Sequence, residues 1–168
     1  MIKQIFLIVS LLVSSFAVQA TEKWPFLEDY EPTTKELRCI AKNIYFEARN
    51  QSVAGRTAVG LVTINRMYDK RWPNTACGVV FQAKLWDNKV PVRNQCQFSW
   101  YCDGLSDTIR VMSDWDDAIY QAKNAVRLFN GGADFTEGSN HYHSINVDPW
   151  WAPSYEFVVR IDDHLFYK

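Results

Sequence analysis

Glu47 is the residue whose type and position most clearly invite chemistry. It lies near the end of a segment in which Leu37, Ile40 and Ile44 recur at helical spacing. At about 100° per residue it projects close to Ile40 and Ile44, so its carboxyl is expected at the margin of a buried stripe. Desolvation and the negative end of the helix macrodipole both favour the protonated carboxyl. Such a carboxyl can act as a general acid near neutral pH. A purely structural interpretation is also open, in which Glu47 pairs with Arg49 or Arg66 at the helix edge.

The elements that must position Glu47 begin with a helix after Pro32. Thr33 and Glu36 have capping-box spacing, and the apolar period continues to Ala48. A second helix is expected over residues 54–67, where Gly55 and Gly60 indicate close packing against a neighbour.

The rest of the chain changes character twice. Residues 84–107 show no sustained period and are expected to form a long loop pinned by a disulfide. A third helix is expected to open at Ser113 with Asp116 and to end at Gly131-Gly132. Residues 155–161 alternate and predict a strand.

The N-terminus has the pattern of a secretory signal peptide over residues 1–20. Met1 to Lys3 is positive, Ile5 to Phe16 is almost wholly apolar, and Ala17 to Ala20 is a small-x-small cleavage site. The alternative is a membrane anchor, but the apolar run is shorter than the roughly 20 residues of a spanning helix. We therefore expect export, to the periplasm or medium, and no stable membrane insertion after cleavage.

Charge and cysteine content narrow the class further. The formal charge of −1 becomes −2 once the single lysine of the leader is removed, which gives no electrostatic basis for binding nucleic acid. The four cysteines favour two disulfides in an exported chain, and zinc is the weaker interpretation because no C-x-x-C pair occurs. Spacing allows three pairings. We expect Cys39 with Cys96 and Cys77 with Cys102, although a Cys96–Cys102 pair would rigidify the residues between them.

Six stretches, in order along the chain, resemble the SleB/CwlJ-type cell wall hydrolases, the spore cortex-lytic enzyme family. Any one motif is weak, but their order carries the resemblance, which covers roughly residues 37–167. The stretches are Tyr45–Arg49 (Y-x-E-A-R), Ala58-Val59 with Asn65-Arg66, Trp72–Val80, Gln97–Ser99, His141–His143 with Pro149 and Trp151, and Ile161 with His164, Phe166 and Tyr167.

The resemblance implies an α+β fold: a mainly helical, lysozyme-like or lytic-transglycosylase-like domain with a small C-terminal β-element. On this basis residues 21–36 are an N-terminal extension and residues 37–168 the catalytic domain. The resemblance also implies an enzyme acting on the glycan strands of peptidoglycan, between N-acetylmuramic acid and N-acetylglucosamine, with Glu47 as its catalytic acid.

The sequence departs from the family pattern at two places. Asn50 and Gln51 follow Arg49, where the family usually has Gly-Glu, and Asp162 replaces a glycine. Loss of the second acid affects a lytic transglycosylase least, because the 6-hydroxyl of the sugar can close on C1 and one carboxyl serves as acid and then base. A hydrolase normally uses a second carboxylate. Asp103, Glu137 and Asp148 could supply one, and nothing in the sequence selects among them.

The remaining candidate residues are expected to bind substrate: Gln97, Ser99, Trp100, His141 and Trp151. Tryptophans can stack on sugar rings, although core packing explains them at least as often. His141, His143 and His164 could together ligate zinc. We favour no metal and no cofactor, because alternate residues on a strand can simply share a face and the resemblance implies no metal.

Two other functions stay open at this point. One is a non-catalytic peptidoglycan-binding protein, and the other is a zinc amidase that cuts the peptide stem. For the enzyme we expect a monomer whose partner is the glycan strand.

Overall fold

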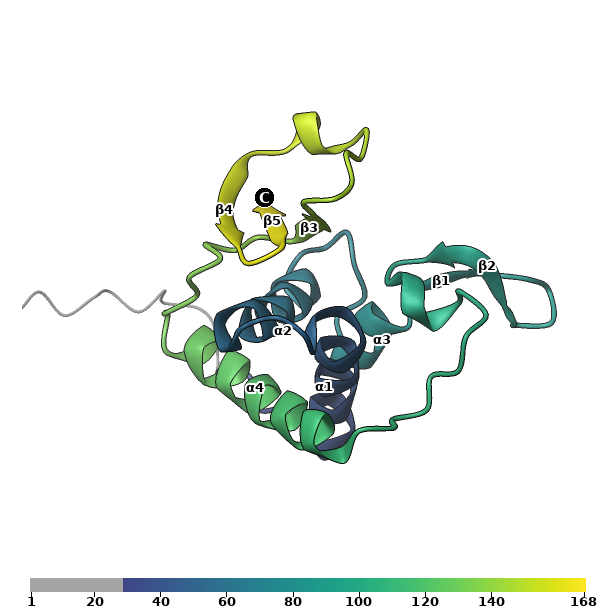
Figure 1. Cartoon of the computed structure of the whole chain (residues 1–168), viewed down its shortest axis with the longest axis horizontal. Helices are drawn as coiled ribbons and strands as arrows, with labels where there is room; N and C mark the ends of the chain where they lie inside the picture. Colours follow the sequence, from purple (N-terminus) through teal and green to yellow (C-terminus); the bar gives the residue numbers. More distant parts are fainter. Residues whose placement is uncertain (1–28) are drawn as a thin grey trace, which may run out of the picture.

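The computed structural model describes residues 29–168, so the predicted signal peptide lies outside the described residues. A helical body lies beside a small three-stranded sheet, and a two-stranded hairpin projects from the other side (Figure 1). The elements in order are α1 (Thr34–Ala48), α2 (Val53–Met67), α3 (Ala76–Val80), β1 (Ala83–Leu85), β2 (Pro91–Cys96), α4 (Met112–Asn130), β3 (His141–Ser144), β4 (Phe157–Ile161) and β5 (His164–Tyr167), with single 3₁₀ turns at Ser99–Tyr101 and Ala152–Ser154. The predicted α+β architecture is confirmed.

Helices α1, α2 and α4 surround the main core. The predicted capping box at the start of α1 is present, because Thr33 and Glu36 satisfy each other's backbone N–H groups. Gly60 lies where α2 crosses both neighbours. A Cβ there would come within 2.9 Å of the Ala125 Cβ and 3.1 Å of the Ile44 Cδ1. The close packing predicted at this glycine is confirmed.

The start of α4 differs from the prediction. The helix begins at Met112, its N-cap is Val111, and no side chain caps it. Ser113 instead contacts the neighbouring Asp114 at 3.5 Å. The helix starts here because Trp115 and the alanines that follow it pack on α1, so tertiary burial decides the boundary. Its predicted end at Gly131 is confirmed.

The C-terminal sheet has the antiparallel order β3-β5-β4. Its inner face packs on α2, where Phe166 is fully buried with Ala58 and Val62. The predicted strand at residues 155–161 corresponds to β4, and β5 pairs with both of its neighbours. This pairing brings Tyr142 of β3 opposite Phe166.

The expected long loop over residues 84–107 is only partly a loop. It contains most of the β1–β2 hairpin and a 3₁₀ turn. The sequence did not predict these strands because they are short and largely exposed, so their residues show no apolar alternation.

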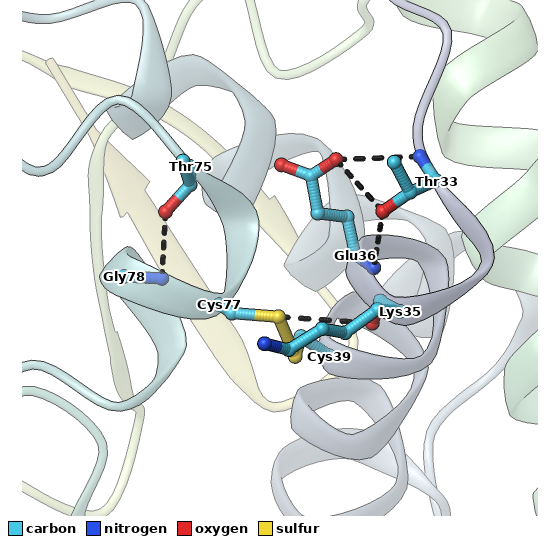
Figure 2. Close-up of a disulfide and its surroundings, with 7 residues drawn as sticks. All are labelled: Thr33, Lys35, Glu36, Cys39, Thr75, Cys77 and Gly78. Atoms are coloured by element: carbon cyan, nitrogen blue, oxygen red, sulfur yellow. Dashed lines mark hydrogen bonds between the residues drawn. A yellow bond between two sulfur atoms is a disulfide. The ribbon is translucent and has the colours of Figure 1, made fainter.

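Both disulfides form, but the pairing we expected is wrong. Cys39 pairs with Cys77, with 5.2 Å between their Cα atoms, and Cys96 pairs with Cys102. The first bridge ties α1 to α3 beside the capping box (Figure 2). Sequence spacing could not reveal this, because α3 is held against α1 by packing between residues far apart in the chain.

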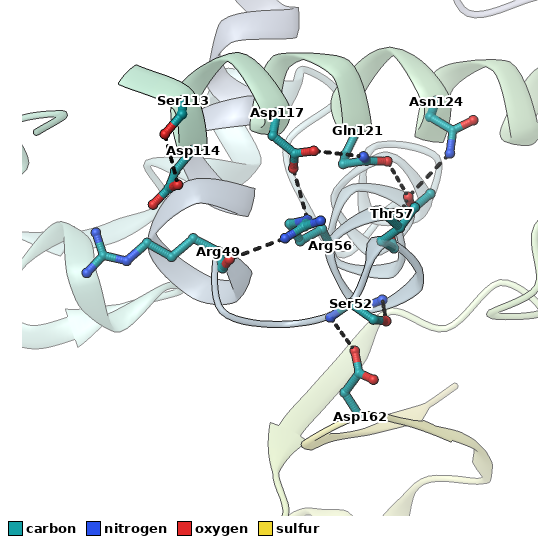
Figure 3. A network of polar contacts seen from close by, with 12 residues as sticks. Arg49, Ser52, Arg56, Thr57, Ser113, Asp114, Asp117, Gln121, Asn124 and Asp162 are labelled. Atoms are coloured by element: carbon teal, nitrogen blue, oxygen red, sulfur yellow. Dashed lines mark hydrogen bonds and ion pairs between the residues drawn. The ribbon is translucent and has the colours of Figure 1, made fainter. Parts of the chain in front are cut away.

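The two departures from the family pattern meet in space, at the junction between the α1–α2 loop and the β4–β5 turn. The Gln51 side chain donates to Asp163 Oδ2 at 3.3 Å and accepts from the Asp163 backbone N–H at 3.2 Å. Asp162 has φ of 50° and accepts from the Ser52 backbone N–H at 2.8 Å (Figure 3). Gln51 therefore links the α1–α2 loop to the β4–β5 turn through two hydrogen bonds with Asp163.

Within residues 29–168, no helix is long and apolar enough to cross a membrane.

Candidate active site

Glu47 lies in the last turn of α1, facing the sheet. Its Oε2 accepts a hydrogen bond from the Tyr142 hydroxyl at 3.1 Å. Among the residues that the structure describes, Glu47 makes no ion pair within 4.0 Å. The Arg49 guanidinium lies instead over the Tyr45 ring, 5.2 Å from its centroid. The structural interpretation of Glu47 as one half of a close arginine pair is therefore not realised.

Burial raises the pKa of the Glu47 carboxyl. The hydrogen bond from Tyr142 and the positive charge of Arg66 oppose this rise by stabilising the carboxylate. Burial is the largest of the three effects, so the protonated form persists to higher pH than in a solvated glutamate. This is the electrostatic condition that a general acid requires.

Arg66, at the end of α2, is the cation of the site. It is 3% exposed, and its Nε donates to the Asn140 carbonyl at 2.7 Å. Its guanidinium lies between the rings of Trp72 and Phe98, at 5.5 and 5.0 Å. Burial lowers the pKa of Arg66 to about 10, which leaves it charged at neutral pH. Its Nη1 is buried without a partner among the described residues, so one donor remains for a bound oxygen.

Asn140 connects this cation to His141. Its side-chain amide donates to Asp69 Oδ2 at 3.3 Å, which leaves Asn140 Oδ1 to accept from His141 Nδ1 at 2.6 Å. The imidazole proton is therefore on Nδ1, and Nε2 carries a free lone pair. Burial, followed by the charges of Arg66 and Arg71, lowers the pKa of His141 to about 4, so the ring is neutral.

Aromatic rings surround His141. Its centroid lies 4.0 Å from that of Tyr155 and 5.4 Å from those of Trp72 and Trp151. Trp151 also contacts His143 and Tyr167. Flat apolar faces beside a hydrogen-bond acceptor suit a sugar ring, which has apolar C–H faces and hydroxyl edges.

Trp100 lies elsewhere than expected. It is 6% exposed, stacks on Phe46 at 4.7 Å, and its indole N–H donates to Asn43 Oδ1 at 3.0 Å. Asn43 is itself fully buried and lies one turn before Glu47 on α1. Trp100 is therefore a core residue that supports this helix.

Gln97 and Ser99 are exposed, on either side of the buried Phe98. Phe98 contacts Arg66, which places this turn beside the site. Trp150 is 88% exposed and contributes nothing to the core.

The three histidines do not converge on a metal site. His141 and His143 share the outer face of β3, where His143 stacks on Tyr167. His164 lies on the inner face with Tyr142 and Phe166. Alternation along paired strands thus separates His164 from the other two. Among residues 29–168, no group of three or more His, Cys, Asp or Glu side chains could hold a metal ion.

The candidate second acids lie apart from Glu47. Asp103 accepts from the Leu105 N–H at 2.7 Å, Glu137 pairs with Lys168 at 3.7 Å, and Asp148 lines a cavity against the sheet. Within the described part of the chain, Arg66 is the charged group that shifts the pKa of Glu47, and none of these acids does so.

The sequence patterns indicate no chemical role for Asp69, Asn140, Tyr142 or Tyr155, and they suggest Arg66 only as an ion-pair partner of Glu47. Arg66, Trp72 and Tyr142 all fall inside the stretches that resemble the family. Their motif membership was the available signal, but only the fold brings their side chains to Glu47 and His141.

The family model described as cell wall hydrolase matches residues 50–167. The chain belongs to the cell wall hydrolase family. The matched range begins three residues after Glu47, so the role of Glu47 depends on its geometry and on the E-A-R motif. A hydrolase of the cell wall agrees with the class of enzyme that the sequence predicts.

Similar proteins agree with this membership. The spore cortex-lytic enzyme of Bacillus subtilis (strain 168) is 32% identical over 50 residues, which is 30% of this chain and 16% of that enzyme. The match thus spans about a sixth of that enzyme's length.

Two solved structures share the fold. The catalytic domain of Bacillus cereus SleB has a TM-score of 0.63 at 22% identity, covering 82% of this chain and 93% of that one. The catalytic domain of the germination-specific lytic transglycosylase SleB from Bacillus anthracis has a TM-score of 0.56 at 20% identity, covering 82% and 97%. They show that this chain has the fold of the SleB catalytic domains.

Proposed function

We propose that this chain is an exported enzyme that cleaves peptidoglycan glycan strands between N-acetylmuramic acid and N-acetylglucosamine, as a lytic transglycosylase. Glu47 is its general acid. One observation carries the proposal: a partly buried carboxyl, with its pKa raised by burial, that accepts a hydrogen bond from a tyrosine hydroxyl and is influenced by the charge of the buried Arg66.

The reaction needs only one carboxyl. Protonated Glu47 donates its proton to the glycosidic oxygen, and the bond from that oxygen to C1 of the muramic sugar breaks. The 6-hydroxyl of the same sugar closes on C1 and returns its proton to the Glu47 carboxylate. The product is a 1,6-anhydro sugar, and the enzyme regains its starting protonation state.

The departure of this chain from the family pattern at Gln51 fits a transglycosylase mechanism better than hydrolysis. A hydrolase uses a second carboxylate about 5–10 Å from the first. Gln51 occupies the position of the family's second acid, and both ends of its amide are engaged by Asp163. Arg66 stabilises the Glu47 carboxylate once the proton has left.

The sugar-binding roles follow from the site. The neutral His141 offers Nε2 to a sugar hydroxyl, Trp151 offers a ring face, and Gln97 and Ser99 offer exposed polar groups near Arg66. Trp100 is a positioning residue, because its contacts with Asn43 and Phe46 support the helix that carries Glu47.

The test is to digest purified sacculi with the mature protein and analyse the products by mass spectrometry. Anhydro-muramic ends are expected. Reducing ends would indicate a hydrolase, released stem peptides an amidase, and no products a binding protein. Any of these three results contradicts the proposal, and Glu47→Gln is the matched inactive control. N-terminal sequencing of exported protein should find a start at or next to Thr21.

A further inference from the structure

The face of α1 that points away from Glu47 carries a row of positive charges. Lys35, Arg38 and Lys42 line a cavity of about 610 Å³. At about 100° per residue, Arg38 lies roughly 180° around the helix from Glu47. We call this cavity the α1 trough, and it is separate from the site around Glu47.

These charges act against the local stability of the helix. Lys35 and Arg38 are spaced i,i+3, and Arg38 and Lys42 are spaced i,i+4, so like charges are neighbours on one face. Lys35 and Arg38 also lie at the N-terminal end of α1, where the macrodipole disfavours cations. The acids of α1 do not compensate, because Glu36 is engaged in the capping box and Glu47 faces the other way. A local conflict of this kind is typical of a functional surface.

Aromatic rings, not carboxylates, hold these cations. The Arg38 guanidinium lies 5.4 Å from the Trp115 ring centroid. The Lys42 ammonium lies 5.4 Å from Trp100 and 5.7 Å from Phe81. None of the three cations makes an ion pair with another residue in the described range 29–168. The cations are therefore held in place while their N–H donors stay available.

One carboxylate, Asp107, also lines the trough. Burial raises the pKa of this carboxyl, and the Lys42 charge opposes the rise. A second cavity of about 360 Å³ shares Asp107 and continues along α1 past Asp103 to Arg49. Both cavities border α1. Cations line them on the helix side, and Asp103, Asp107 and Arg110 line them on the segment that faces it.

We propose that the α1 trough binds the peptide stem of peptidoglycan. Stem peptides carry free carboxylates and, on their diamino acid, a primary amine. The carboxylates match Lys35, Arg38 and Lys42, and the amine matches Asp107. A polyphosphate chain has no positive group for this acid and would meet repulsion from it. This inference depends on the proposed function, because the stem is part of the same substrate.

The trough can be tested with the free stem peptide alone. A tetrapeptide containing diaminopimelate is titrated into the mature protein and followed by calorimetry and by amide chemical shifts. Saturable binding is expected, with shifts along α1 and residues 103–110. The Lys35→Gln/Arg38→Gln double variant should weaken binding by at least about tenfold, because charge-assisted hydrogen bonds are lost. Lys123→Gln, an exposed lysine of α4 outside the trough, is the matched control and should bind like wild type.

A second variant tests the carboxylate of the trough. Asp107→Asn should weaken the native peptide but not a peptide whose side-chain amine is acetylated. Melting temperatures measured on the same preparations establish that every variant is folded.

Three results would overturn the proposal: no saturable binding at millimolar peptide, full affinity in the double variant, or inorganic phosphate that competes as well as the peptide. Each is independent of catalysis. Stem binding without glycan cleavage would contradict the proposed function but support stem binding by the trough. Glycan cleavage without stem binding would contradict the trough proposal but not the proposed function.

Discussion

The two faces of α1 differ in whether their charged side chains have fixed partners. On one face Glu47 is partly buried, with Tyr142 as its hydrogen-bond donor and Arg66 as the cation that influences its pKa. On the other face Lys35 and Arg38 are exposed and lie next to each other, and neither makes an ion pair within residues 29–168. A buried charge must be matched by fixed partners, since desolvation is costly, and this matching is what tunes a pKa for proton transfer. An exposed charge costs little to leave unmatched, so it stays available for a ligand.

The largest effect is expected from Glu47→Gln, which tests whether the carboxyl on the buried face takes part in proton transfer. The amide keeps the shape and removes the titrating proton. Glycan cleavage should fall by at least ~10²-fold, the scale of general acid–base catalysis. The measurement is turnover on purified sacculi at fixed pH. Near-wild-type turnover by the folded variant would remove Glu47 from the mechanism.

The same variant makes a prediction on stability with a definite sign. The folded-state pKa of Glu47 is raised, so its contribution to stability is fully present below its unfolded pKa and is lost as pH rises through the folded pKa. Glu47→Gln should therefore melt higher than wild type at pH 7 and above, and the difference should shrink as pH falls toward ~4. Thermal melts at pH 4 and pH 8 measure it, and a variant that melts lower at pH 8 would indicate a structural pairing for Glu47.

Tyr142→Phe tests the partner on the buried face. The Tyr142 hydroxyl stabilises the Glu47 carboxylate and so lowers its pKa. Removing a hydrogen bond to a charged group, worth ~1.5–3 kcal/mol, should raise the Glu47 pKa by roughly one unit or more. In the proposed mechanism the protonated acid is the active form, so the limb where activity falls with rising pH should move upward. An unmoved limb in the pH–rate profile contradicts the assigned contact.

Asn140→Ala should have a smaller effect on cleavage. The backbone carbonyl that accepts from Arg66 remains, but the side-chain link from Asp69 to His141 is lost. His141 should then populate both neutral tautomers, which nitrogen NMR of the ring can measure. Cleavage should fall by about tenfold, the loss expected from one neutral hydrogen bond to substrate. A ring that keeps the proton on Nδ1 in the variant would show that Asn140 does not set the tautomer.

The smallest effects are expected on the exposed face. The Lys35→Gln/Arg38→Gln variant should cleave glycan strands stripped of their stems at the wild-type rate. Its free energy of unfolding should change by less than about 0.5 kcal/mol, because the relief of like-charge repulsion is offset by loss of the Arg38–Trp115 contact. Denaturant titration measures the stability, and a clear loss of stability would show that these cations support the fold.

Local patterns predicted the helices well and the remaining parts poorly. The capping box at Thr33 and the end of α4 at Gly131 depend on residues close together in sequence, and both were predictable. The β1–β2 hairpin has no apolar face that a sequence pattern could show. Helix α3 is only five residues long, and its position depends on packing around Cys39. The disulfide pairing failed for the same reason, because it reports distances that only the packed helices determine.

The candidate acid, the helix that carries it and the family resemblance could all be recognised without a structure, since each depends on residue types at short spacing. Tertiary structure decided what surrounds the acid. Tyr142 reaches Glu47 only because β3 pairs with β5 and the sheet packs on α2. Arg66 acts on the carboxyl only because α2 ends beside β3, where Asn140 receives its Nε–H. A pKa is a property of surroundings, and in this protein those surroundings come from segments that lie up to 95 residues away along the chain.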